Sequence, residues 1–244
     1  AEPTIMRLDD ALLGHDSSYL LDGHRGMINS FFPQKGKGLV PKLRERLESD
    51  QLIIDIGAGT GEFTVGLTDA FNNQVIGIDH HEKTVEQAND SYASEVESLS
   101  FEQGDVFSLG EKFEGKAGLI TANTTLHNLD DLPSALGQIY QCLDKGGSFV
   151  FTDLNPEQIL SNPALQRLYE VRKQLGELNF CGQILQPTKL EGGNNAMLDM
   201  AMYLSTIAAY TATELENELK TAGFSKVSVQ VDGSGQAVVG YAIK

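Results

Sequence analysis

The chain has 244 residues and carries 34 acidic against 18 basic side chains, giving a net charge of −16 that argues against nucleic acid and anionic membranes as partners. No apolar run approaches the ~20 residues of a membrane span, and the first residues lack the basic and apolar regions of a signal peptide. The two cysteines, Cys142 and Cys181, have no metal-ligand partners at short spacing, so the composition predicts a cytoplasmic protein without a metal site.

The first predicted element with a clear chemical role is an apolar run at residues 52–56. It is interrupted by one acid, Asp55, and glycines follow at Gly57, Gly59 and Gly61. The run predicts a strand buried on both faces of a parallel sheet, and the glycines predict a tight turn where the backbone approaches a ligand. A helix is expected from Glu62 onward. Strand, turn and helix in this order form the first half of a nucleotide-type site.

The spacing of these glycines discriminates between nucleotide ligands. A dinucleotide site has the pattern G-x-G-x-x-G, with the diphosphate at the helix start. Here the pattern is G-x-G-x-G, and Glu62 would place a carboxylate where it repels a diphosphate. S-Adenosylmethionine suits the turn better, because it carries a sulfonium and an ammonium and only one carboxylate. Asp55 adds a negative group near the expected position of that ammonium.

Two further strands are predicted to end in acids. Residues 75–79 end in Asp79, about twenty residues beyond the glycines, where an acid accepts hydrogen bonds from ribose hydroxyls. Residues 99–103 run into Gly104 and Asp105, and Asp105 can accept a bond from an adenine amino group. His80 or His81, directly after the ribose acid, is expected to border the adenine.

A fourth strand is predicted at residues 117–123, and it ends at Asn123 before a loop that contains His127. Apolar residues then recur at helical spacing from Leu132 to Leu143, and the glycines of residues 145–147 are expected to close that helix. Residues 148–153 form the fifth predicted strand. After a helix beginning near Thr211, the runs 227–231 and 237–243 predict a closing hairpin.

In order and spacing these segments resemble the class I S-adenosylmethionine-dependent methyltransferases. The resemblance covers roughly residues 52–153 and 211–244 and departs from the family's pattern at Lys145, where a proline is frequent. It implies an α/β fold: a doubly wound, mostly parallel seven-stranded sheet (Rossmann-like) with an antiparallel last strand. It implies cofactor contacts at Gly57, Gly59, Gly61, Asp79, Asp105 and the main chain near Asn123, with Ala58 and Val106 in the same segments.

Domain organisation is predicted from composition and loop length. Residues 1–50 form an N-terminal helical extension, 51–153 the cofactor-binding core, 154–210 a helical cap insertion, and 211–244 a helix and hairpin that complete the core. In many methyltransferases a preceding helix folds over the cofactor, so Tyr19 either lines the pocket or packs on the core. The cap is too long for a simple connection and is placed to select the acceptor.

The predicted activity is transfer of a methyl group from the sulfonium to a small-molecule acceptor by in-line displacement. Positioning supplies most of the rate, and a general base is needed only where the acceptor must lose a proton. His127 is the candidate base, with a purely structural role as the alternative. Another S-adenosyl transferase, moving an aminopropyl or carboxymethyl group, and a non-catalytic cofactor-binding protein stay open; a nicotinamide oxidoreductase is disfavoured. The sequence leaves the acceptor and the oligomeric state unspecified.

Overall fold

The computed structural model describes residues 39–94, 96–157, 209–232, 235 and 237–244. The predicted contact at Tyr19 and nearly all of the predicted cap insertion lie outside the described residues. None of the described helices has the length and apolar composition needed to cross a bilayer.

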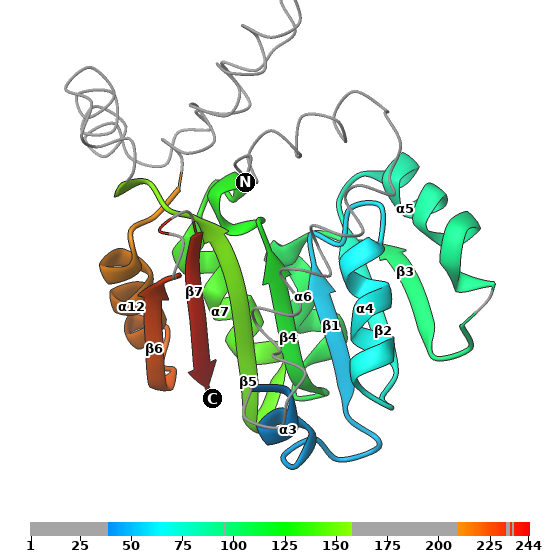
Figure 1. The fold of residues 1–244 in the computed structure, drawn as a ribbon, viewed down its shortest axis with the longest axis horizontal. Helices are drawn as coiled ribbons and strands as arrows, with labels where there is room; N and C mark the ends of the chain where they lie inside the picture. Colours follow the sequence, from blue (N-terminus) through cyan, green and yellow to red (C-terminus); the bar gives the residue numbers. More distant parts are fainter. Residues whose placement is uncertain (1–38, 95, 158–208, 233–234, 236) are drawn as a thin grey trace, which may run out of the picture.

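A seven-stranded sheet with the order β3-β2-β1-β4-β5-β7-β6 forms the centre of the molecule (Figure 1). Strands β1 to β5 run parallel, while β7 lies antiparallel between β5 and β6. This confirms the predicted doubly wound sheet and its closing hairpin. The strands are β1 (Leu52–Ile56), β2 (Val75–Asp79), β3 (Leu99–Gln103), β4 (Ala117–Asn123), β5 (Leu143–Leu154), β6 (Ser225–Val231) and β7 (Ala237–Ile243).

Helices cover both faces of the sheet and divide the core into two layers. Ile53 and its neighbours on one face pack against α3, α4 and α5, whereas Ile54 and Ile56 on the other pack against α6, α7 and α12. Successive β1 residues alternate between the layers, as expected for a strand buried on both sides. The helices are α3 (Leu39–Arg44), α4 (Glu62–Ala70), α5 (Glu82–Ala88), η1 (Asn89–Ala93), η2 (Val106–Ser108), α6 (Leu109–Phe113), η3 (Leu126–Asn128), α7 (Leu132–Cys142) and α12 (Ala212–Thr221).

Side-chain caps set the starts of two helices that support the sheet. The Asp131 carboxylate accepts the backbone N–H of Ser134 at the start of α7. Thr211 and Glu214 form a reciprocal capping box at the start of α12, in which each side chain accepts the other's backbone N–H. The helix start predicted at Thr211 is therefore confirmed, and the capping pattern explains it.

The start of β5 corrects one prediction. Helix α7 ends at Cys142, and Leu143 already has extended backbone as the first residue of β5. Leu143 pairs with Ala117 and Ser148 pairs with Leu119, so five residues of β5 pass two of β4. The glycines at 146 and 147 therefore do not close a helix. They allow this irregular entry into the strand, since Gly146 has a φ of 81°.

Candidate active site

Those predicted site residues that the structure describes gather at or near the carboxyl ends of the parallel strands, the upper edge of the sheet in Figure 1. The order of the strands reverses between β1 and β4, because β2 and β3 lie to one side of β1 and β5 lies beyond β4. In an open α/β sheet, loops diverge to opposite faces at such a point and leave a crevice for a ligand. The loops after β1, β2, β3 and β4 all begin at this edge.

The turn after β1 has the backbone that its glycines require. Gly57, Gly59 and Gly61 have φ values of 70°, 55° and 95°, in the left-handed region that side chains with a Cβ rarely adopt. The N–H groups of Gly57 and Ala58 donate to the Ile78 carbonyl at 2.8 and 3.0 Å, which ties the turn to β2. A Cβ on Gly59 would meet no protein atom within 4 Å, so this part of the turn is open to a ligand.

Asp79 fastens the turn from the end of β2. Its Oδ2 accepts the N–H of Gly59 at 2.9 Å, and its Oδ1 accepts the N–H of His81 at 2.9 Å. The side chain is largely buried. Through these two hydrogen bonds, one carboxylate holds both the glycine turn and the residue before α5 in place. Each carboxylate oxygen has a second lone pair, which keeps further acceptor capacity for a ligand hydroxyl.

Three other predicted residues follow β2 and β3. His80 is mostly exposed and its ring packs on that of His81, with centroids 3.7 Å apart. Asp105 caps the short helix η2 by accepting the N–H of Phe107 at 3.0 Å. Val106 is buried in the core layer formed with α6 and α7. The structure thus places His80 and Asp105 at the rim and Val106 beneath it.

Asp55 lies below the turn, enclosed by protein and only 1% exposed. Its two oxygens accept the hydroxyls of Thr64 in α4 at 2.6 Å and of Thr121 in β4 at 2.8 Å. Burial raises the pKa of Asp55 to about 7, and the nearby Asp79 charge adds to this, while the two threonine hydrogen bonds oppose it. The carboxyl group therefore links β1, α4 and β4, and its protonation changes near neutral pH.

The loop after β4 packs directly against the glycine turn. The Asn123 side-chain oxygen accepts the Thr152 hydroxyl of β5 at 3.0 Å. Thr124 has a φ of 54°, a left-handed conformation that is uncommon for a residue with a branched Cβ. The Thr125 hydroxyl lies 3.2 Å from the carbonyl of Ile56, the last residue of β1.

His127, in η3, is held by Asp153 near the end of β5. Its Nδ1 lies 2.6 Å from Oδ1 of Asp153, and its backbone N–H donates to Oδ2 at 2.9 Å. Both side chains are buried, with 5% and 2% of their surfaces exposed. Sequence reasoning identified His127 but missed Asp153. The available signal was an acid at the end of the fifth strand, matching the acids after β2 and β3.

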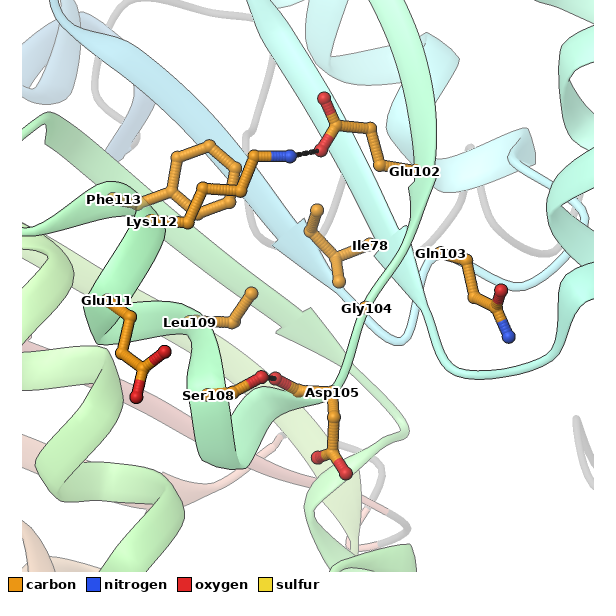
Figure 2. A pocket seen from close by; sticks show the side chains of 10 residues that line it. All are labelled: Ile78, Glu102, Gln103, Gly104, Asp105, Ser108, Leu109, Glu111, Lys112 and Phe113. Carbon is orange, nitrogen blue, oxygen red and sulfur yellow. Dashed lines mark hydrogen bonds and ion pairs between the residues drawn. The ribbon is translucent and has the colours of Figure 1, made fainter.

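A cavity of about 330 Å³ lies beside this edge, between β3 and α6 (Figure 2). The Lys112–Glu102 ion pair lies at one end of it, and Asp105 lies at the other. Asp105 is the residue that the cavity shares with the predicted cofactor set. The cavity therefore adjoins the site on the α6 side of the sheet and does not contain the glycine turn. Among the described residues, no cluster of three or more His, Cys, Asp or Glu side chains is arranged to hold a metal ion.

Comparison with known proteins agrees with this architecture. Residues 47–221, more than half of the chain, match the family described as Methyltransferase domain. Demethylmenaquinone methyltransferase of Leptospira interrogans is 23% identical over 84% of this chain and 80% of its own. Trans-aconitate 2-methyltransferase of Deinococcus radiodurans is 33% identical, but over 39% of this chain and 34% of its own length.

A solved structure shares the fold. A SAM-dependent methyltransferase from Aquifex aeolicus superposes with a TM-score of 0.57 at 13% identity, over 91% of this chain and 97% of its own. At that identity the likeness concerns the fold, which the strand order had already indicated. Together with the match to the family, it shows that the chain belongs to the class I S-adenosylmethionine-dependent methyltransferases, with S-adenosylmethionine as its cofactor.

Proposed function

We propose that the edge formed by the loops after β1 to β4 binds S-adenosylmethionine and transfers its methyl group to a small-molecule acceptor. The observation that carries the proposal is the turn of Gly57, Gly59 and Gly61, held by the Asp79 carboxylate. It presents bare backbone beside an acceptor-only side chain. Such a surface fits a ligand with a ribose and a cationic centre, whereas the Glu62 carboxylate in the first turn of α4 disfavours a diphosphate.

The residues present fit the cofactor in three respects. The open space over Gly59 allows the cofactor to approach the backbone closely. Asp79 keeps lone pairs for the ribose hydroxyls, and Asp105 at the rim can accept from the adenine amino group beside His80. Asp55 lies beneath the turn and holds β1, α4 and β4 together through its hydrogen bonds with Thr64 and Thr121. Its direct contact with the ammonium, and contacts by Tyr19, Ala58, Val106 and Asn123, stay predictions.

When bound, S-adenosylmethionine supplies an activated methyl group on its sulfonium. The chain's contribution is to orient this group against the acceptor and to exclude water, which can account for most of the rate. The loop after β4 is suited to that role, because Thr125 fixes it to the end of β1 and His127 is fixed to β5.

A small molecule is the acceptor class that the relatives support. Two of them are named for demethylmenaquinone and trans-aconitate, although the Deinococcus match covers only 34% of that enzyme. The net charge of −16 further disfavours a polyanionic substrate such as nucleic acid. A cytoplasmic location remains our inference from the composition.

A second candidate is another group transfer with a modified S-adenosyl cofactor. The observation behind it is the similarity to a carboxy-S-adenosyl-L-methionine synthase of Nautilia profundicola, named as an enzyme that makes such a cofactor, which is 26% identical over 77% of this chain and 75% of its own. The glycine turn and Asp79 suit either reaction, because both cofactors share the adenosyl part.

Calorimetric titration of the purified protein with S-adenosylmethionine, S-adenosylhomocysteine, carboxy-S-adenosylmethionine and NAD tests the proposal. We expect micromolar binding of the first two compounds and no heat from NAD. Binding of NAD alone would overturn our interpretation of the glycine turn. A clear preference for the carboxylated cofactor would favour the second candidate.

A further inference from the structure

The buried His127 ring has one nitrogen without a hydrogen-bond partner among the described residues. Nδ1 faces Asp153, but in the described part of the chain Nε2 forms no hydrogen bond, although only 5% of the side chain is exposed. A buried polar atom without a partner costs about 1–3 kcal/mol, so such atoms usually have a functional reason. The orphan nitrogen indicates that a ligand group completes this site.

The surroundings of Asp153 determine which ring nitrogen carries the proton. Two backbone N–H groups already donate to its carboxylate, that of His127 to Oδ2 at 2.9 Å and that of Leu154 to Oδ1 at 2.7 Å. Both oxygens of the carboxylate therefore serve as acceptors of backbone donors. Nδ1 of His127 must then donate to it, which leaves Nε2 as a proton acceptor.

The His127–Asp153 pair belongs to the same edge of the sheet as the glycine turn. Thr125, two residues before His127, contacts Ile56, and its side chain fills the position that a Cβ on Gly57 would occupy. Asp153 lies near the end of β5, the strand next to β4. The pair thus stands on the β4–β5 side of the crevice, opposite the loops of β2 and β3 that hold Asp79 and Asp105.

We propose that Asp153 is a positioning residue that keeps Nε2 of His127 free to act as the general base, and that the acceptor is therefore a hydroxyl compound. This rests on the proposed function. A hydroxyl becomes a strong nucleophile only as it loses its proton, whereas a neutral amine attacks through its own lone pair and a thiol ionises readily near its pKa of about 8.5. A buried, oriented base therefore accelerates methyl transfer chiefly to a hydroxyl acceptor.

The bond changes of this step balance without any further reactant. The hydroxyl oxygen of the acceptor forms a bond to the methyl carbon as the carbon–sulfur bond breaks, and that electron pair stays on sulfur. The hydroxyl proton moves to Nε2 of His127, and Asp153 stabilises the resulting imidazolium. Release of the proton to water restores the base.

The proton position on His127 can be measured directly by nitrogen-15 NMR of the imidazole rings. The chain has five histidines, and the spectrum of His127→Gln assigns the signal. With S-adenosylhomocysteine bound, we expect a protonated Nδ1 and an unprotonated Nε2, and we expect this preference to be lost in Asp153→Asn. A wild-type proton on Nε2, or an unchanged tautomer in Asp153→Asn, would overturn the proposal.

Asp131→Asn is the matched control, because Asp131 is an exposed carboxylate near the same loop that caps α7. Asparagine also caps helices, so this variant should keep the His127 tautomer, the unfolding temperature and the cofactor affinity. The NMR measurement of the tautomer in the wild-type protein tests the proposal even if Asp153→Asn fails to fold.

The acceptor class is tested with labelled S-adenosylmethionine and a panel containing a phenol, a catechol, an aliphatic alcohol, a thiol and a primary amine. We expect methylation of a hydroxyl compound, a loss in kcat of about 100-fold or more in His127→Gln and of at least tenfold in Asp153→Asn, and little change in KM. Transfer only to the thiol or amine, or to no hydroxyl compound, would overturn the proposal. Calorimetry on the wild-type protein distinguishes failure of the proposed function from failure of this inference. Absence of S-adenosylhomocysteine binding would refute the proposed function, whereas binding without methyl transfer to a hydroxyl compound would refute only this inference.

Discussion

The Thr125 side chain occupies the space that a Cβ on Gly57 would need, with Oγ1 only 2.3 Å from that position. The same hydroxyl lies 3.2 Å from the Ile56 carbonyl and 3.0 Å from the Asn123 carbonyl. The loop after β4 therefore packs against bare backbone of the loop after β1. Gly57 is therefore required for the packing of these two loops, in addition to any role in binding a ligand.

Gly57→Ala should consequently destabilise the protein. The positive φ alone costs about 1 kcal/mol, and the clash with Thr125 adds to it. Chemical denaturation measures the effect. Gly115→Ala is the control, since Gly115 has a similar φ of +64° but no atom within 4 Å of the new Cβ. Equal losses in the two variants would contradict the packing argument, and Thr125→Ala should recover part of the difference.

Gly59→Ala should separate binding from stability. Its φ is +55° and its Cβ would enter open space, so the loss of stability should match that of Gly115→Ala, about 1 kcal/mol. A methyl group there would meet the bound cofactor, and we expect S-adenosylhomocysteine affinity to fall at least tenfold by calorimetry. Unchanged affinity would show that the cofactor does not approach this residue.

Asp79→Ala should weaken S-adenosylhomocysteine binding by an order of magnitude or more. The change removes the expected ribose acceptor and also releases the N–H groups of Gly59 and His81. Adenine alone, titrated in parallel, lacks the ribose and should lose less affinity. An unaltered affinity for S-adenosylhomocysteine would remove Asp79 from the site.

The buried Asp55 should make stability depend on pH. Because its pKa is raised from 3.8 to about 7 in the folded state, the folded protein keeps a proton that the unfolded chain has lost between these values. This group therefore reduces the free energy of unfolding by about 1.4 kcal/mol per pH unit from about pH 4 to pH 7, with no further loss above that.

Asp55→Asn should remove that slope, so the stability of the variant relative to wild type should rise between pH 5 and pH 8. Denaturation midpoints measured at several pH values provide the comparison. Asp69→Asn, at an exposed position of α4, should retain the wild-type profile. Parallel pH profiles for Asp55→Asn and wild type would mean that the carboxyl group titrates alike in both states.

The sequence predicted the sheet well, because most of its strands are short, largely apolar runs, and β1, β2 and β3 end in, or run directly into, glycine or an acid. The same local signals located Asp79 and Asp105, which lie at strand ends. They misplaced the end of α7, because Leu143 continues the helical apolar spacing while its burial comes from β5. Apolar periodicity alone does not distinguish these two ways of burying a leucine.

The pairing of His127 with Asp153 was beyond local reasoning. The two residues are 26 positions apart and meet because β4 and β5 are neighbours in the sheet. The enclosure of Asp55 was equally hidden, since its partner Thr121 lies 66 positions away. Both contacts depend on strand order, which the family resemblance implied without indicating which side chains face one another.

The irregular entry into β5 bears on how the protein can be labelled. Its extra residues are taken up at the amino end of the strand, whereas pairing with β4 is regular from Ser148 to Thr152. Lys145 is exposed there, and a Cβ added to Gly146 would meet no atom within 4 Å. A fluorophore or short tag inserted between them would sit at the end of the sheet opposite the active site, where a change of chain length need not shift Asp153.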